Sequence, residues 1–410
     1  MSRCYAIACL AAVLSLSACG NDEASPLPNP APVVGGLPPI ASNTGFEIAR
    51  LADGPHMGII VGFDDLSQGP FDRQMRSAAL LDEAASSGAS ISRIQLDWPE
   101  LETQPGQSEA APLAEALETA RQRGQLVFVT LSTLDSDGLT LPEDLLDGDG
   151  KLRDGLSLAS PEVLERFQRF LDWMVPLLGP DVWALSMGNE VDSPIADGLV
   201  PAGDALVFYQ AGARRIKAID PDLATTVTLT IGAPSTVPDF AAQLNDSLDV
   251  ATVNHYCLDA ELQIAGQSQW ERDVQIMKDM ARGRPIMIQE LGCPVSYAGD
   301  PAAFASRTGT MNGSQDLQAE YFAFFDRLYA EDPQFRAATV FQLFDWSPEL
   351  AEMFGDFVRA EGEPLAGDRL EEWLATVGTC RWSDGTCRPA WDVWLASLSR
   401  QSQIRAQMAD

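Results

Sequence analysis

The sequence has few of the residues from which metal and nucleotide sites are built. Its 410 residues include two histidines, His56 and His255, and its seven cysteines contain no Cys-x-x-Cys pair. Zinc and haem sites usually need histidines or closely spaced cysteines as ligands. No Gly-x-Gly-x-x-Gly or P-loop pattern opens an expected helix, so a nucleotide has no recognisable binding loop. We therefore expect no metal and no organic cofactor.

Basic residues are also scarce. There are 27 Lys and Arg against 59 Asp and Glu, which gives a formal net charge of −32. We expect no nucleic-acid partner, because few cations are available to replace the counterions along a phosphate backbone. The same charge argues against anionic membrane faces and polyanionic sugars, and it favours a soluble, acidic surface. With 46% hydrophobic residues the chain can still bury a large core.

The N-terminus has the features of an export signal. In residues 1–18 a single cation, Arg3, precedes an apolar run from Tyr5 to Leu16 that is too short for a membrane-spanning helix. The sequence Leu-Ser-Ala-Cys at 16–19 resembles the bacterial lipobox, after which the signal is cleaved and Cys19 is acylated. The alternative is a plain secretory signal that ends in cysteine.

A proline-rich linker is expected to follow the signal. Residues 19–45 carry six prolines between small residues, and such a segment stays extended and does not pack. Together the two segments predict an exported lipoprotein at the outer membrane or cell surface, with the periplasmic face as the other position for its anchor. The folded domain is expected over residues 46–405.

Short apolar runs alternate with amphipathic segments along this domain. The runs typical of buried strands lie at 57–63, 90–96, 126–131, 181–187, 225–231, 250–254, 285–289 and 337–344. The segments typical of helices lie at 71–87, 111–123, 162–178, 204–219, 239–244, 269–281, 317–330 and 390–398. This alternation predicts an α/β protein, a monomeric (β/α)₈ TIM barrel with enlarged loops after strands three, seven and eight.

Two of the expected strands end on a glutamate. The stretch WALSMGNEV at 183–191 ends with Asn189 and Glu190, and the stretch PIMIQELGCP at 285–294 contains Glu290. The carboxyl ends of all strands meet at one face of a barrel, so we expect both carboxyl groups there. Glycoside hydrolysis needs two such groups, one to protonate the leaving oxygen and one to attack the anomeric carbon. The alternative is that each is a helix-start carboxylate near the backbone dipole.

Asn189-Glu190 at the end of strand four and Glu290 at the end of strand seven resemble the large clan of retaining (β/α)₈ glycoside hydrolases. This clan includes β-glucanases, mannanases, galactanases and β-glycosidases, and the resemblance covers the whole barrel through short motifs. It implies that Glu190 is the acid/base and Glu290 the nucleophile. It also implies that Asn189 binds the 2-hydroxyl of the sugar.

The resemblance extends to donors around the nucleophile. Arg93 on strand two matches the arginine of the clan that contacts the nucleophile, although an exposed strand end is the alternative. Tyr256 at the end of strand six matches the tyrosine that donates to it. Both donors are expected to hold the pKa of Glu290 down. Asn254 points the same way as Tyr256 by strand alternation, whereas His255 points outward into a second layer.

Two tryptophans are candidates for contacts with the flat face of a sugar. Trp346, at the end of strand eight, resembles the tryptophan that forms the floor of the sugar subsite. Trp98, after strand two, is expected to form a second platform. Core packing is the alternative for both.

The sequence departs from the clan after strand three. Many relatives have a histidine here that holds a sugar hydroxyl, and this chain has none. The polar residues that could take its place are Ser132, Thr133 and Asp135.

Four cysteines remain after those in the signal and Cys19. Cys257 and Cys293 each lie three residues past a strand-end residue, Asn254 and Glu290, on neighbouring strands. The other two, Cys380 and Cys387, flank a short loop. An even number in an exported protein predicts a disulfide in each pair, with buried reduced thiols as the alternative.

These features predict an exported, lipid-anchored O-glycosyl hydrolase that cleaves β-linked polysaccharides or their oligomers by double displacement, through a covalent glycosyl-enzyme intermediate. A carbohydrate-binding lipoprotein that keeps the barrel without turnover is one alternative. A transglycosylase that uses the same acids is another. A solute-binding lipoprotein would need two lobes, which the single strand–helix alternation does not favour.

Overall fold

The computed structural model describes residues 51, 54–62 and 70–409. The predicted signal at 1–18, the linker at 19–45 and the acylated Cys19 lie outside the described residues. Within the described part, no helix has the length and apolar character needed to cross a membrane.

Parallel strands form a closed ring. Their bounds are β1 (His56–Ile59), β2 (Ile91–Asp97), β5 (Leu126–Ser132), β8 (Val182–Ser186), β9 (Ala224–Thr226), β10 (Thr228–Thr230), β11 (Ala251–Tyr256), β12 (Ile286–Gly292) and β13 (Phe335–Val340). One sheet has the order β2-β5-β8-β9 and the other the order β1-β13-β12-β11-β10. The short strands β9 and β10 are two halves of the fifth predicted strand, so they join the two sheets at one seam.

The other seam lies between β1 and β2. The backbone N–H of Ser90 donates to the carbonyl oxygen of Met57 at 3.0 Å. Gly58 allows this close approach, because a Cβ atom there would lie 1.9 Å from the carbonyl oxygen of Ile91. The ring is therefore closed, and the predicted (β/α)₈ barrel is confirmed.

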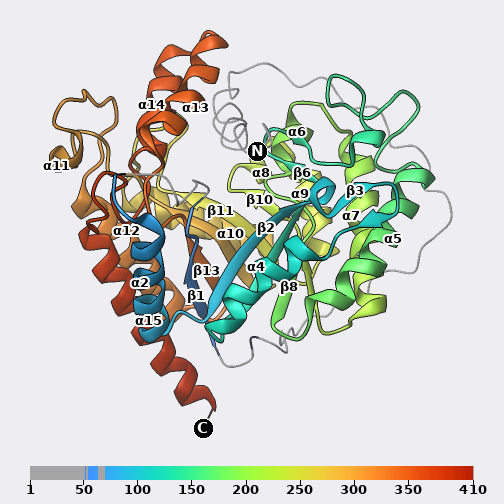
Figure 1. The fold of residues 1–410 in the computed structure, drawn as a ribbon, viewed down its shortest axis with the longest axis horizontal. Coiled ribbons are helices and arrows are strands. Elements are labelled where there is room, and N and C mark those ends of the chain that lie inside the picture. Colours follow the sequence, from blue (N-terminus) through green and yellow to red (C-terminus); the bar gives the residue numbers. More distant parts are fainter. Residues whose placement is uncertain (1–50, 52–53, 63–69, 410) are drawn as a thin grey trace.

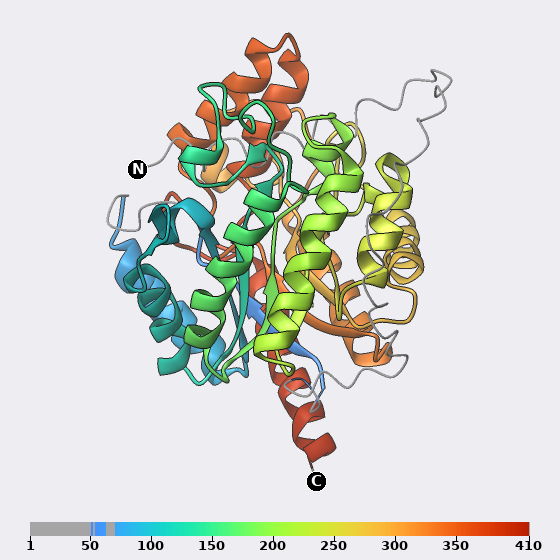
Figure 2. The ribbon, with the colours of Figure 1, turned by 90° about the vertical axis from the view of Figure 1, so that its right-hand side faces the viewer.

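Helices cover the outside of the ring. The eight that follow the strands are α2 (Arg73–Ser86), α4 (Ala111–Gln122), α5 (Pro161–Leu178), α7 (Ala202–Ile219), α9 (Pro238–Asp246), α10 (Gln267–Ala281), α12 (Gln315–Glu331) and α15 (Pro389–Ala409). Figure 2 shows α5 and α7 side by side along one flank. At the starts of α2 and α12 a side chain caps the helix, since Asp72 accepts the N–H of Met75 and Ser314 accepts that of Leu317.

Three excursions leave the barrel after strands three, seven and eight. The first, 133–160, contains β6 (Leu134–Asp135) and β7 (Gly138–Leu139), and the second, 293–314, contains α11 (Pro301–Phe304). The third, 341–388, contains α13 (Pro348–Ala360) and α14 (Pro364–Leu374), which the sequence analysis had not predicted. Figure 1 shows this helical hairpin at one end of the barrel and the end of α15 at the other.

Smaller elements complete the chain. They are α3 (Trp98–Leu101), β3 (Glu102–Gln104), β4 (Gln107–Ser108), a 3₁₀ turn (Glu143–Leu145), α6 (Asp192–Ala196) and α8 (Ala233–Thr236).

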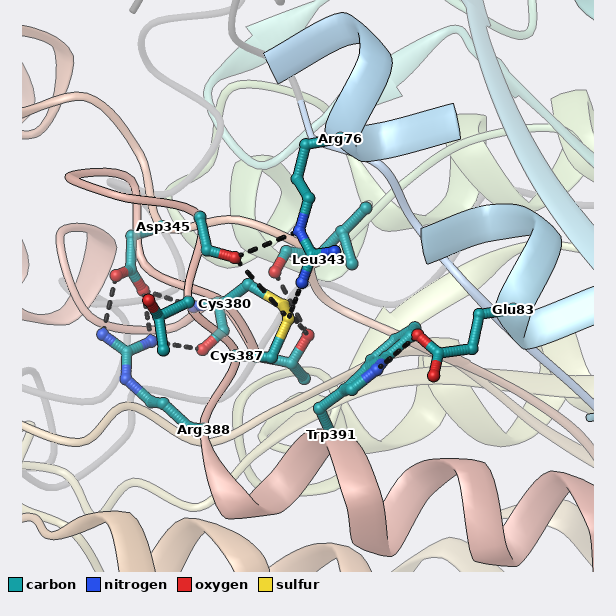
Figure 3. Close-up of a disulfide and its surroundings, with 12 residues drawn as sticks. Arg76, Glu83, Leu343, Asp345, Cys380, Cys387, Arg388 and Trp391 are labelled. Carbon is teal, nitrogen blue, oxygen red and sulfur yellow. Dashed lines mark hydrogen bonds and ion pairs between the residues drawn. A yellow bond between two sulfur atoms is a disulfide. The ribbon is translucent and has the colours of Figure 1, made fainter. Parts of the chain in front are cut away.

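Both predicted disulfides are present. Cys257 and Cys293 join the segments just after β11 and β12, with their Cα atoms 5.1 Å apart. Cys380 and Cys387 close the loop before α15. Arg76 on α2 lies against this loop and donates to the carbonyl oxygen of Gly385 (Figure 3).

A buried ion network ties the excursion after strand eight to the one after strand seven. The guanidinium of Arg388 donates to Asp345 at 2.7 Å and to Asp300 at 2.9 Å, and all three side chains are fully buried. Arg381 also pairs with Asp300 at 2.8 Å. The contact between Arg388 and Asp345 is visible in Figure 3. Charges this deep are tolerated only because each has its partners.

We predict that Arg388→Ala lowers the free energy of unfolding by about 3–5 kcal/mol, because it leaves the buried carboxylate of Asp345 without its cation and Asp300 with Arg381 alone. Urea unfolding followed by circular dichroism measures this loss. As a control, Arg169→Ala removes an exposed i,i+4 ion pair with Glu165 and is expected to change stability by less than about 0.5 kcal/mol. Equal effects of the two substitutions would contradict a structural role for the network.

Candidate active site

Glu190 lies just after β8 in a constrained turn. Its φ of 47° is in the left-handed region, which is uncommon for a residue with a side chain. Gly188 is required before it, because a Cβ atom there would lie 2.5 Å from the side chain of Val191 and 2.9 Å from the hydroxyl of Tyr209. The turn holds the carboxyl group of Glu190 in a buried position, 5% exposed. Local strain of this kind is often kept where a side chain has to be aimed.

Glu290 is placed by a β-bulge in β12. Val253 pairs with Ile288, but the next residue of β11, Asn254, pairs with Glu290. Gln289 is therefore the extra residue of the bulge, which breaks the strict alternation of side chains. As a result, Gln289 and Glu290 both bond to residues of the candidate site.

Two donors contact the carboxylate of Glu290. The guanidinium of Arg93 lies 3.4 Å from Oε1, and the hydroxyl of Tyr256 donates to Oε2 at 2.5 Å. The carboxylate is 6% exposed. Both residues were predicted at these positions from the resemblance, and the structure brings them to the predicted partner.

Glu190 has a weaker set of partners. The side-chain amide of Asn254 donates to its Oε1 at 2.9 Å and also to Oδ1 of Asn189 at 3.2 Å. Gln289 donates to the same oxygen of Asn189 at 2.8 Å. The structure thus joins Glu190, Asn189 and Asn254 in one hydrogen-bonded set, and neutral amides are the only donors to Glu190 in it.

Burial raises the pKa of both glutamates. For Glu190 the shift is large, and the negative charge of Glu290 adds to the effect of burial. For Glu290 burial also raises the pKa, while Arg93 and Tyr256 oppose the rise. The expectation that these donors would hold the pKa of Glu290 down is therefore wrong in its net direction. Their lowering effect is present, but the loss of solvent exceeds it.

The prediction that Trp98 forms a platform for a sugar is wrong. Trp98 is fully buried beneath α5, packs against Phe167 and Phe170, and donates its indole N–H to Glu102 at 2.8 Å. It is a core residue and has no face for a sugar. The structure therefore supports core packing, the alternative for Trp98.

Trp346 lies near the start of the excursion after strand eight. Its ring packs edge-on against Phe354 of α13, with ring centroids 5.0 Å apart. Its backbone N–H donates to the carbonyl oxygen of Leu374 at the end of α14. The ring is 4% exposed. Its role as the floor of a sugar subsite stays a prediction.

The polar residues after strand three all bond within the protein. Thr133 donates to the carbonyl oxygen of Met187 at 2.6 Å, and Ser132 donates to Asp135 at 3.1 Å. Asp135 also accepts a hydrogen bond from Asn189 at 2.9 Å. That one of the three takes the place of the missing histidine stays a prediction.

His255 belongs to a second layer, as predicted. Its ring nitrogens contact the hydroxyl of Tyr321 at 2.6 Å and the carboxylate of Asp273 at 3.1 Å, and the residue is fully buried. Across residues 51, 54–62 and 70–409, no group of three or more His, Cys, Asp or Glu side chains is arranged to hold a metal ion.

Two glutamines that organise the site were not predicted from the sequence. Gln289 accepts hydrogen bonds from Thr130 and Thr228, both at 2.7 Å, across the barrel interior. Gln95 of β2 accepts a hydrogen bond from Arg93. Gln289 directly follows the apolar run Ile286-Met287-Ile288 of β12, where an uncharged amide is stable only if it is bonded. That pattern was visible in the sequence for Gln289, whereas Gln95 lies in β2 among other polar residues and had no such signal.

No family model and no curated protein sequence matches the chain, but solved structures match most of it. A GH5_18 protein from Streptomyces cattleya, a variant in complex with Manb1-4GlcNAc, is 18% identical with a TM-score of 0.60 over 86% of this chain and 81% of that chain. A GH5_18 protein from Bifidobacterium longum subsp. infantis is 13% identical with a TM-score of 0.57, over 85% and 78%. The exo-beta-1,4-mannosidase Op5Man5 from Opitutaceae bacterium strain TAV5 is 16% identical with a TM-score of 0.59, over 86% and 60%.

The chain has a GH5-like barrel fold. At these identities the likeness shows the fold, whereas the chemistry has to be argued from the residues of the site.

We predict that Glu190→Gln makes the protein more stable at high pH. Because the pKa of Glu190 is raised on folding, its protonated form contributes stability below the unfolded pKa, and this contribution is lost as the pH rises through the folded pKa. The neutral amide removes that loss. We expect a gain of about 1 kcal/mol or more near pH 8 and a smaller change near pH 5, measured by urea unfolding.

The control for this prediction is Glu320→Gln, at an exposed position on α12. It is expected to change stability by less than about 0.5 kcal/mol at either pH. A Glu190→Gln protein with the same pH dependence as the wild type would show that burial and the charge of Glu290 do not act on this carboxyl group.

Proposed function

We propose that the protein is a retaining glycoside hydrolase that acts on β-linked glycans. The observation that carries the proposal is the unequal environment of two buried carboxyl groups at the carboxyl ends of two barrel strands, β8 and β12. Among the residues that the structure describes, Glu290 receives a cation and a hydroxyl donor, whereas Glu190 receives a neutral amide alone. Double displacement needs this difference, because one group must attack while ionised and the other must deliver a proton.

In this proposal Glu290 is the nucleophile. Arg93 and Tyr256 each address a different oxygen of its carboxylate, so they favour the ionised form and fix its orientation. Attack on the anomeric carbon would form a covalent glycosyl-enzyme intermediate and free the leaving group. The same two donors hold the carboxylate again when water has released the sugar.

Glu190 is the acid/base. Burial and the charge of Glu290 keep its proton on at rest, ready for the leaving oxygen. When Glu290 becomes part of an ester its negative charge disappears, and the pKa of Glu190 falls. Glu190 is then able to take a proton from the attacking water, which is the second role that a retaining mechanism requires.

Asn189 is suited to bind the sugar 2-hydroxyl. Its Oδ1 accepts hydrogen bonds from Gln289 and Asn254, so its amide nitrogen must face the other way. One N–H of that nitrogen donates to Asp135, and among the described residues no other group accepts from it. The second N–H is placed to donate to the substrate, in a contact that strengthens as positive charge develops on the ring.

The substrate class follows from charge and from the structural neighbours. A chain with a net charge of −32 favours neutral over anionic glycans. Among the neighbours, one is named an exo-beta-1,4-mannosidase and another is in complex with Manb1-4GlcNAc. These names make β-mannosides the first substrates to test for this chain, ahead of β-glucosides and β-galactosides.

We predict that Glu290→Ala lowers kcat on an aryl β-glycoside by at least about 10⁴-fold, because it removes the group that forms the intermediate. A panel of aryl β-glycosides and β-linked oligosaccharides identifies the substrate, and proton NMR of the first product shows whether the β-anomer is retained. Glu320→Gln is the exposed control and should keep full activity.

The same assay separates the proposal from its alternatives. Inverted product, or unimpaired hydrolysis by Glu290→Ala, would contradict the mechanism. Products longer than the substrate would indicate a transglycosylase. Binding of glycan without turnover by the wild type would indicate a carbohydrate-binding protein on the same barrel.

We also propose that the protein is exported and anchored through lipid on Cys19, from the lipobox at 16–19. An anchored hydrolase would act on glycans outside the cytoplasm, and the proline-rich segment after Cys19 would separate its barrel from the membrane. We predict that Cys19→Ala abolishes incorporation of labelled palmitate and releases the protein from the membrane fraction. Retention of the label by this variant would contradict acylation at this residue.

A further inference from the structure

Asp135 occupies a central position that the proposed mechanism does not use. It ends β6 in the excursion after strand three and is 4% exposed. Its Oδ1 accepts from the amide of Asn189 at 2.9 Å and from the backbone N–H and hydroxyl of Ser136 at 2.8 and 3.2 Å. Its Oδ2 accepts from Gln95 at 2.9 Å and Ser132 at 3.1 Å. Five donors use the acceptor capacity of this carboxylate, so it has little left for a substrate.

One chain of hydrogen bonds leads from Asp135 to Glu190. Because an ionised carboxylate only accepts, it binds the nitrogen of the Asn189 amide and turns the oxygen of that amide away. This oxygen accepts from Asn254 at 3.2 Å, and Asn254 donates from the same nitrogen to Glu190 at 2.9 Å. Because the carboxylate of Asp135 can only accept, it determines which group donates and which accepts in each hydrogen bond of this chain.

A second chain leads from Asp135 to Glu290. Asp135 binds the nitrogen of the Gln95 amide, so the oxygen of Gln95 faces Arg93 and accepts from its guanidinium. Arg93 in turn lies 3.4 Å from Glu290. A flipped Gln95 amide would point its N–H groups at the guanidinium, which has no acceptor.

We propose that Asp135 is a positioning residue that fixes both catalytic glutamates through these two chains. This inference rests on the proposed function, because the role of Asp135 is to position the proposed acid/base and nucleophile, Glu190 and Glu290. Asp135 sets which way the amides of Asn189 and Gln95 point, and these amides orient the partners of Glu190 and Glu290. A carboxylate is required, since an asparagine would offer one oxygen and would direct its own N–H groups at one of the two amide nitrogens.

The charge of Asp135 also reaches both glutamates. It raises the pKa of Glu190 and of Glu290, although burial is the larger cause for each. Several other ionisable groups surround it on the packed elements. They are Arg93 and Asp97 on β2, Asp137 in the same excursion, and Tyr209 on α7. Arg93 is the one cation among them.

The test is the pH profile of kcat/KM for Asp135→Asn on a substrate that the wild type hydrolyses. We expect kcat to fall at least about tenfold, with KM within about threefold, because the groups that react are misaligned. Removal of a negative charge lowers the pKa of both glutamates. Activity needs Glu290 ionised and Glu190 protonated, so both limbs of the profile should move to lower pH by about half a unit.

Asp326→Asn is the matched control. Asp326 is a buried aspartate on α12 that accepts from Ser397 and pairs with Arg400, away from both chains. We expect it to lower stability without moving either limb. Asp135→Glu keeps the charge and both acceptor oxygens, so it should leave the limbs in place while its longer side chain lowers kcat at least about threefold.

These variants give outcomes that separate the inference from the function on which it rests. An active wild type with an unchanged kcat and unchanged limbs in Asp135→Asn overturns the inference alone. If the wild type does not hydrolyse any glycan, the proposed function fails, and ¹³C NMR of labelled glutamates still measures whether Asp135→Asn lowers both pKa values. If Asp135→Asn does not fold, Asp135→Glu decides, and wild-type kcat in that variant overturns the inference.

Discussion

The β-bulge at Gln289 is the feature on which the site depends. Without it, Gln289 and Glu290 would point to opposite faces of β12, because side chains alternate along a strand. With it, Glu290 meets Arg93 and Tyr256, and Gln289 reaches Asn189 while accepting from two threonines. One extra residue in one strand thus connects the polar interior of the barrel to both glutamates.

The two glutamates have different donors. Glu190 accepts from the amide of Asn254, whereas Glu290 has Arg93 and Tyr256 as its donors, and this difference separates the two roles. Every amide oxygen and nitrogen in the set has a defined direction, since carboxylates accept and guanidinium groups donate. A network of this kind is stable inside a protein only if its members are satisfied. The site is therefore organised before any sugar arrives, which lowers the reorganisation that the reaction would need.

Much of the fold was predictable because each barrel strand is a short apolar run followed by an amphipathic helix. The two glutamates were predictable for a related reason, as a charged residue at the end of such a run has to lie at an open end of the barrel. Arg93 and Tyr256 came from the resemblance, and the structure brings both to Glu290.

Other features depend on tertiary contacts that no local pattern carries. Trp98 was misassigned because the packing of α5 over it cannot be read from the residues around it. The hairpin of α13 and α14 lies in an excursion whose length suggested only a loop. The net pKa of Glu290 could not be predicted, since it is a balance between burial and two donors, and only the structure gives the degree of burial.

The two excursions after strands seven and eight explain how the site keeps its shape around Glu290. Cys257 and Cys293 join the segments that follow Tyr256 and Glu290, so the chain cannot separate just beyond the donor and its acceptor. The buried network around Arg388 holds Asp345, the residue before Trp346, against the excursion after strand seven. Because charges inside a protein are costly to separate, this network resists any opening that would pull strand eight away from the glutamates. Covalent and ionic ties beyond strands six to eight therefore restrict the chain around Glu290, the same carboxyl group that the second chain from Asp135 orients through Gln95 and Arg93.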